Sequence, residues 1–340
     1  MSRTFWKPLV WTLAAAAVPS LARADLLTDW NIVTTGNFRS HSSTEVEGAV
    51  RIGGNMDVNQ YQVGVHLTDV FGPAAKSQTS LVVGGNVTGI VTVHAGNAQI
   101  GGTGAQVSAT NYTGPGVQTG VASVQGIGAQ DAAQLQGYSQ AFASMATLSA
   151  NTVILPTTQP AGVVFTVAAV DANNNAVFNI NGADLFGSKT QQIGLSLSGL
   201  TESQVKTVII NVTGTAISFS NWSGNFSGFF TQSWARSHVI WNFQDATSLD
   251  LTNREFNGAI LAYQASLQTG SAPVQGSVFV REYFGPNGVG QTGEVHMPLY
   301  QGYVPGLTPT ATPEPSSFAM AGLAMAASAG VAWRRKRARA

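Results

Sequence analysis

The chain has 340 residues, of which 16 are basic, 16 are acidic and none is cysteine. Disulfides and thiolate metal sites are therefore excluded, so stability must come from buried apolar surface and backbone hydrogen bonds. Eight basic residues and one acidic residue lie in the first 24 and last 28 positions, which leaves residues 25–312 with a formal charge of −7 and argues against nucleic acid as a partner.

Residues 1–24 have the order of a secretory signal peptide. Arg3 and Lys7 precede an apolar run over residues 9–18, and Ala22-Arg23-Ala24 is an A-x-A cleavage site. About ten apolar residues are too few to span a bilayer. We therefore predict export, with signal peptidase cutting after Ala24.

Short β-branched runs that end in glycine or Gly-Asn fill residues 25 to about 128. They include residues 46–55, 81–87 and 89–102. Such runs predict strands joined by turns that need positive φ. Short strands at close intervals favour a β-solenoid, in which each rung stacks on its neighbour, and a β-sandwich is the alternative.

Residues 129–150 break this pattern and predict one amphipathic helix. Apolar side chains recur there at intervals of three and four, at Ala132, Leu135, Tyr138, Phe142, Met145 and Leu148. We expect this stripe to pack against the β body.

Strand patterns return after the helix, beginning at Thr152. They cover 152–155, 163–170, 177–180, 207–212, 217–219, 239–243, 248–251, 258–262 and 274–280. No linker interrupts residues 25–302, so we predict one mainly β domain.

Five aromatic residues crowd a stretch rich in Ser, Gly and Asn, and they are Trp222, Phe226, Phe229, Phe230 and Trp234. Aromatic side chains on a polar loop can stack against sugars or another protein. They can equally cap the exposed last rung of a solenoid. Both interpretations stay open at this point.

No catalytic, metal-binding or cofactor motif is present in the sequence. The five histidines are scattered, without metal-ligand spacing. Residues 171–175 begin like a calcium loop, but Ala176 and Gly182 stand where an EF-hand has Gly and Glu, so an Asn-rich hairpin turn is the better interpretation. We expect a protein without enzymatic activity or cofactor.

The C-terminal region has three parts, starting with a Pro/Thr linker at 303–312 that would act as an extended spacer. An uncharged stretch, Ser317–Trp333, is at the lower length limit for a transmembrane segment. A basic cluster follows it, and the positive-inside rule would keep that cluster cytoplasmic. Its members are Arg334, Arg335, Lys336 and Arg337, with Arg339 behind them.

Residues 313–340 resemble the PEP-CTERM sorting signal of Gram-negative bacteria. The resemblance rests on Pro313-Glu314-Pro315, the apolar stretch and the basic end. It implies an exosortase as partner, cleavage near Pro-Glu-Pro, and a link to exopolysaccharide and biofilm formation.

Residues 25–302 resemble the choice-of-anchor A domain. The matching elements include the Gly-Gly-Asn motifs at 53–55 and 84–86 and Trp241-Asn242-Phe243-Gln244-Asp245-Ala246-Thr247, whereas Tyr263 departs from the usual proline. The resemblance implies an adhesive domain with a β-solenoid fold of the ice-binding type.

Three functions follow from these patterns. We expect first a non-enzymatic adhesive protein at the cell surface or in the extracellular matrix, with exopolysaccharide as a candidate ligand. Ice binding is the second, although Thr88, Thr92, Thr103, Thr110 and Thr113 show no regular register. A β-helical polysaccharide hydrolase or lyase is the third.

Overall fold

The computed structural model describes residues 25–285, 288 and 290–306. The chain divides into two compact units, Met1–Tyr303 and Val304–Ala340, and the elements below lie in the first. The predicted signal peptide, residues 307–312 of the linker and the whole predicted sorting signal lie outside the described residues.

Ten strands form one continuous parallel row, here called row A, with every neighbouring pair parallel. In spatial order the row is β9 (Val117–Gln118), β7 (Asn97–Ile100), β5 (Thr79–Val83), β3 (Val50–Ile52), β1 (Ile32–Thr34), β22 (Val278–Phe284), β20 (Ala259–Gln268), β17 (Val239–Asn242), β14 (Thr207–Thr213) and β12 (Asn175–Asn181).

Two further parallel rows complete the large sheet, because several long strands bend and contribute to more than one row. Row B is β6 (Val87–Val93), β4 (Met56–Val63), β2 (Phe38–Val46), β22, β20, β18 (Ser248–Asp250) and β15 (Ala216–Ser218). Row C is β8 (Val107–Ala109), β6, β4, β2, β23 (Val295–His296), β21 (Val274–Gln275) and β19 (Phe256–Asn257). The register shifts in β2 and β20, at Ser40/Ser43 and Ala262/Ser266, mark the bends.

The chain enters this arrangement in the middle. Strand β1 pairs with β3 on one side and with β22 on the other, although Ile32 and Val278 are far apart in sequence. The N-terminal half builds outward from β1 to β9, and the C-terminal half starts at the far end with β12 and builds back to β22. The protein is thus mainly β, and its parallel rows are solenoid-like. They differ from the antiparallel sheets of a β-sandwich.

Alternation along each strand separates interior from surface. In β4, Met56 and Tyr61 are fully buried, whereas Asn59 and Gln60 are exposed. Such period-2 alternation is what one buried face requires. The strand positions predicted from apolar runs are confirmed in most cases, with β20 extending well beyond the predicted 258–262.

A second sheet lies beside the C-terminal half. It contains β10 (Thr152–Val153), β11 (Ala161–Val167), β13 (Thr190–Leu197) and β16 (Asn225–Gly228), and only the β10–β11 pair is antiparallel. Its inward side chains, such as Phe165 and Phe226, stack edge-on against Trp241 of row A at 5.9 Å between ring centroids. Aromatic rings therefore fill the space between the two sheets.

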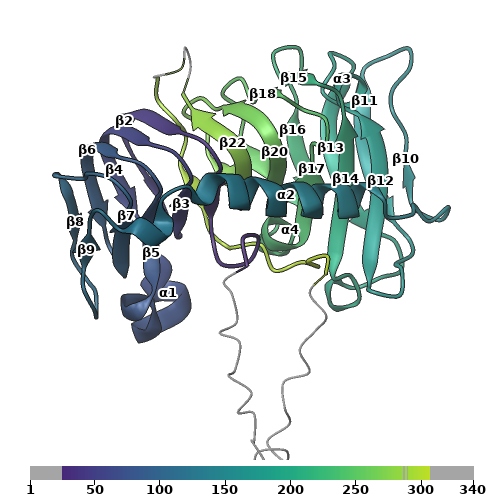
Figure 1. Cartoon of the computed structure of the whole chain (residues 1–340). Coiled ribbons are helices and arrows are strands. Elements are labelled where there is room, and N and C mark those ends of the chain that lie inside the picture. The colour runs from purple at the N-terminus through teal and green to yellow at the C-terminus, as the bar shows by residue number, and fades with distance from the viewer. Residues whose placement is uncertain (1–24, 286–287, 289, 307–340) are drawn as a thin grey trace, which may run out of the picture. The chain divides into compact units, whose positions relative to one another are not determined.

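Helix α2 (Ile127–Ala143) runs across the strands of row A (Figure 1). It buries Leu135, Tyr138 and Phe142, so the predicted amphipathic stripe is confirmed. The predicted end at residue 150 is wrong. The helix ends at Ala143, because the next segment is a turn in which the Ser144 hydroxyl donates to the Ala141 carbonyl (2.8 Å).

A buried chain of asparagines attaches α2 to row A. Asn242 Nδ2 donates to Ser139 O (2.9 Å) and to Asn211 Oδ1 (2.8 Å), and Asn211 Nδ2 donates to Phe142 O (3.1 Å). Asn211 and Asn242 face each other in the β14–β17 register. The Val-Ile-Ile-Asn-Val motif and the Trp-Asn-Phe motif thus supply the side-chain amides that form hydrogen bonds to helix α2.

The remaining helices are short. They are α1 (Leu67–Phe71), η1 (Gly72–Ser77), η2 (Ala122–Val124), α3 (Gly182–Leu185), η3 (Glu202–Gln204), η4 (Phe229–Thr231) and α4 (Ser233–His238), where η denotes a 3-10 helix. Within the described residues, no helix combines the length and apolar character needed to cross a membrane.

Candidate functional site

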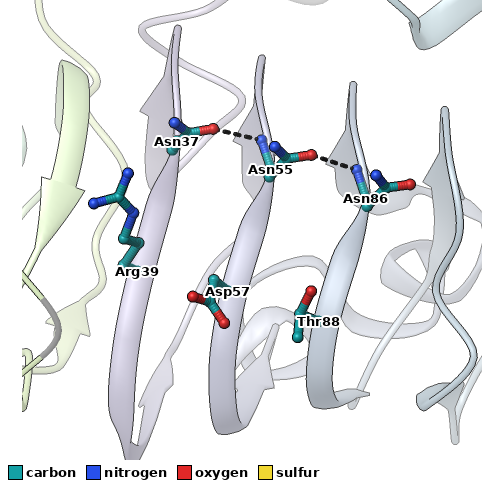
Figure 2. Close-up of a pocket in the computed structure, with 6 residues that line it drawn as sticks. All are labelled: Asn37, Arg39, Asn55, Asp57, Asn86 and Thr88. Atoms are coloured by element: carbon teal, nitrogen blue, oxygen red, sulfur yellow. Dashed lines mark hydrogen bonds between the residues drawn. The ribbon is translucent and has the colours of Figure 1, made fainter.

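An asparagine ladder runs along the corner where row A turns into row B. Asn37 Oδ1 accepts from the backbone N–H of Asn55 (2.9 Å), and Asn55 Oδ1 accepts from that of Asn86 (2.8 Å), as Figure 2 shows. Asn86 Oδ1 continues the series by accepting from the N–H of Thr103 (2.9 Å). Each side chain thus satisfies a backbone donor on the next rung.

The glycines before each asparagine are required by this stacking. A Cβ on Gly84 would lie 2.4 Å from the carbonyl oxygen of Gly53, and one on Gly85 would lie 2.3 Å from Asn55 Oδ1. Neither contact is tolerable, since real Cβ atoms do not approach oxygen so closely. The repeated Gly-Gly-Asn sequence is therefore the local signature of this corner.

A second line of side chains lies beside the ladder, two residues further along each strand. Arg39, Asp57 and Thr88 follow each other in register on β2, β4 and β6. Together with Asn37, Asn55 and Asn86 they line a shallow groove of about 310 Å³ (Figure 2), here called the ladder face. Asn55, Asn86 and Thr88 are exposed.

The charges of the ladder face are only partly neutralised. Asp57 Oδ2 lies 3.4 Å from His41 Nε2. Among the described residues Arg39 has no ion pair. The guanidinium is therefore available to a ligand oxygen, since arginine carries five N–H donors.

The arrangement offers evenly spaced polar groups. Because the ladder uses only the Oδ1 atoms, the Nδ2 groups of Asn55 and Asn86 keep two donors each. Neighbouring strands lie about 4.8 Å apart, so these donors repeat at that spacing. Such a surface suits a hydroxyl-rich polymer or ordered water rather than a reacting bond.

The five predicted aromatic residues divide into two groups. Trp222, Phe226 and Phe230 are buried in the core, with Phe230 stacked on Trp241 at 5.3 Å, so the structure offers no ring face of these three to a ligand. They fill the interior between the sheets. Phe229 and Trp234 are only partly buried.

The remaining residues singled out in the sequence either stabilise a turn or lie outside the described residues. Asp171 Oδ1 accepts from the N–H groups of Asn173 and Asn175, both at 2.8 Å, so a turn is confirmed there. It is not a hairpin, because the flanking β11 and β12 belong to different sheets. Ala24, Pro313-Glu314-Pro315, Ser317–Trp333 and the basic cluster lie outside the described residues and stay predictions.

Two histidines have shifted pKa values for different reasons. The hydrogen bond from His66 Nδ1 to Asp69 Oδ2 (2.6 Å) raises the pKa of His66 above 6.5. Burial lowers the pKa of His238 below 6.5. In the described part of the chain, no group of three or more His, Asp or Glu side chains is placed to hold a metal ion.

No catalytic or ligand motif in the sequence points to the ladder face, although the sequence carries its signal. Gly-Gly-Asn occurs at 53–55 and 84–86, and the degenerate copies Thr35-Gly36-Asn37 and Gly101-Gly102-Thr103 extend the series. A search for the motif at successive rungs would have found the ladder. Arg39 and Asp57 carry no such signal, because only the strand register brings them together.

Parallel rows with a surface asparagine ladder define a solenoid-like β protein. Residues 23–297 match the family described as "Putative Ice-binding-like adhesive domain", and the chain belongs to that family. Residues 311–337 match the PEP-CTERM protein-sorting motif. Both resemblances noted in the sequence are thereby confirmed. Searches of curated proteins and of solved structures found no match.

Proposed function

We propose that this protein is a non-enzymatic surface adhesin whose β-solenoid binds hydrated exopolysaccharide through the ladder face. The adhesive-type domain and the sorting motif fit an exported cell-surface protein of a Gram-negative bacterium, and the motif implies processing by an exosortase. The observation that carries the proposal is the row of exposed asparagine amides at Asn55 and Asn86 beside Arg39, which has no ion pair within the described part of the chain.

Adhesion through the ladder face depends on many weak contacts. A single exposed hydrogen bond contributes little net free energy, about 0.5–1.5 kcal/mol. Repeated sites on one polymer chain add their effects, because each bound unit holds the next one at high local concentration. A flat row of donors is therefore better suited to adhesion than to tight capture of one small molecule.

The test replaces donors without removing the ladder. Asn55→Asp together with Asn86→Asp keeps an acceptor oxygen for the next backbone N–H but removes both NH₂ groups and adds negative charge. We expect the variant, purified in its processed form from the envelope fraction of producing cells, to keep its melting temperature and to lose at least fivefold in retention on the producer's exopolysaccharide.

Asn173→Asp is the matched control, because Asn173 is exposed on a turn away from the ladder face. Unchanged retention of the ladder variant, or an equal loss in the control, would contradict the proposed surface. Release of reducing ends from the same polysaccharide by the wild-type protein would contradict the non-enzymatic part.

Ice binding is the second candidate, because the matched family is described as ice-binding-like. The ladder face, however, carries Arg39 and Asp57, and in the β6–β8 register Thr92 lies opposite Ser108 rather than another threonine. Thermal hysteresis decides between the two candidates. A hysteresis that Asn55→Asp and Asn86→Asp abolish would favour ice over polysaccharide.

Processing is tested separately from binding. We propose that signal peptidase cuts after Ala24 and that an exosortase cuts near Pro313-Glu314-Pro315. Mass spectrometry of the protein recovered from the cell surface should then find Asp25 at the N-terminus and a C-terminus upstream of Ser317. Recovery of both original ends outside the cell would overturn these assignments.

A further inference from the structure

A second pocket lies away from the ladder face, where helix α4 meets the segments before β12 and β14. It has a volume of about 380 Å³ and is lined by Asn174, Glu202, Ser203, Lys206, Trp234 and His238 among others. The volume lies at the small end of the range found for ligand pockets, about 300–1,000 Å³. We call it the Trp234 pocket.

One wall of this pocket is a preformed aromatic stack. Trp234 and His238 are four residues apart on α4, so they lie on the same side of the helix. Their rings are nearly parallel, at 9° between planes and 5.3 Å between centroids. Trp234 is only partly buried and also packs against the core, which holds the indole in place.

The tautomer of His238 is set by its neighbours. Nδ1 lies 3.0 Å from the carbonyl oxygen of Trp234, which can only accept, so Nδ1 carries the proton. Nδ1 also contacts the Ser237 hydroxyl at 2.8 Å. In the neutral ring, Nε2 is then an acceptor, and burial favours that neutral form by lowering the pKa of His238.

Charged and amide groups complete the pocket. Lys206 Nζ donates to the Gln301 carbonyl (2.8 Å) and keeps further N–H donors. Glu202, Ser203 and Asn174 are exposed at the rim. With Lys206 cationic, Glu202 anionic and His238 neutral, the formal charge of the lining is zero, which gives an acidic ligand no advantage.

We propose that the Trp234 pocket is a binding subsite for one neutral sugar residue of a polysaccharide. The indole stacks on the apolar face of the sugar ring, while Lys206 donates to its hydroxyl oxygens and His238 Nε2 and Glu202 accept from its hydroxyls. This inference rests on the proposed adhesion to polysaccharide and names the ligand class of a site distinct from the ladder face.

The experiment measures intrinsic tryptophan fluorescence of the full-length protein during titration with hexasaccharides. The neutral probes are cellohexaose, xylohexaose and mannohexaose, and the acidic probe is hexagalacturonate. We expect saturable binding of at least one neutral hexasaccharide, and no tighter binding of the acidic probe. Saturation by none of the neutral probes, or a preference for the acidic one, would overturn the proposal.

Variants locate the site. Because Trp234→Ala also removes the indole that reports on the pocket, binding to this variant is measured by calorimetry. We expect its affinity for the hexasaccharide to fall at least tenfold. Trp234→Phe keeps an aromatic ring and should recover part of that affinity. Tyr112→Ala is the matched control, since Tyr112 is 46% exposed and lies outside the pocket. Binding that Trp234→Ala leaves unchanged would refute the site.

Rim variants keep the test valid if Trp234→Ala fails to fold. Glu202→Gln and Lys206→Gln alter exposed side chains, and each should weaken binding at least threefold. Their outcome separates the two proposals. Polysaccharide retention that depends on Asn55 and Asn86, with no hexasaccharide binding at Trp234, refutes only the sugar pocket. Hexasaccharide binding at Trp234, with polysaccharide retention that does not depend on Asn55 and Asn86, refutes only the ladder face.

Discussion

Arg51 of β3 and Asp131 of α2 form a two-point ion pair, with Nε–Oδ2 at 2.6 Å and Nη2–Oδ1 at 3.0 Å. The Asp131 side chain is 1% exposed and that of Arg51 is 16% exposed. The Arg51 guanidinium also lies 5.7 Å from the Trp30 ring centroid. The pair therefore joins the start of the helix to the N-terminal half of row A.

Removing the carboxylate should destabilise the protein strongly. Asp131→Asn leaves Arg51 largely buried without a counter-charge, and loss of one partner from a buried pair costs about 3 kcal/mol. We expect a clear fall in the urea midpoint of unfolding. Glu282→Gln is the control, because it breaks the partly exposed Arg281–Glu282 pair (3.7 Å) and should cost less than about 1 kcal/mol. Equal losses would contradict the role of burial.

Two glycine-to-alanine changes should act in opposite directions. Gly84→Ala forces a Cβ against the Gly53 carbonyl, so the ladder corner must shift, at a cost of about 1–3 kcal/mol. Gly137→Ala, in the exposed middle of α2 with no atom within 4 Å of the new Cβ, should stabilise by about 0.5–1 kcal/mol. Melting temperatures check both, and a stabilised Gly84→Ala would refute the stacked corner.

The buried asparagine chain should control the attachment of α2. Asn242→Leu leaves Ser139 and Asn211 without their partners, and each unsatisfied buried group costs about 1–3 kcal/mol. We expect a loss of at least about 2 kcal/mol and faster amide hydrogen exchange in Ile127–Ala143. Asn179→Ala, at the exposed end of the same chain, is the milder control. Unchanged exchange in α2 would show that packing alone holds the helix.

Histidine titrations followed by NMR should separate His66 from His238. The raised pKa of His66 stabilises the fold below pH 6.5, and this contribution disappears as the pH rises through the raised value. The lowered pKa of His238 destabilises the fold as the pH falls below 6.5. Asp69→Asn should lower only the His66 midpoint. A His238 midpoint above that of His66 would contradict these environments.

Local patterns in the sequence predicted most strands correctly. The β-branched run at 207–212 became β14, and 239–243 contains β17. The amphipathic stripe predicted α2 but placed its end too late, because Met145 and Leu148 continue the spacing by coincidence in irregular backbone after the helix. Period and composition are properties of neighbouring residues, so they report local structure and little else.

The candidate sites were harder to predict from the sequence. The cluster at 222–234 pointed to ligand contact or to a cap, yet Trp222 and Phe230 lie in the core, and of the pocket lining only Trp234 belonged to the predicted set. Burial depends on the second sheet packing against row A, which no local pattern encodes. Lys206 and Glu202 reach Trp234 through the pairing of β14 with β17, the strand that follows α4.

The sequence by itself determined the export and sorting signals as predictions, the strands, the helix and the glycine-rich corners, because each depends on residues adjacent in the chain. Only the tertiary structure decided that β1 lies between β3 and β22 and that α2 crosses the row. The ladder face likewise needs Arg39, Asp57 and Thr88 in register. Strand pairing joins distant segments through backbone hydrogen bonds that any residue except proline can make, so the sequence marks strands more clearly than their partners.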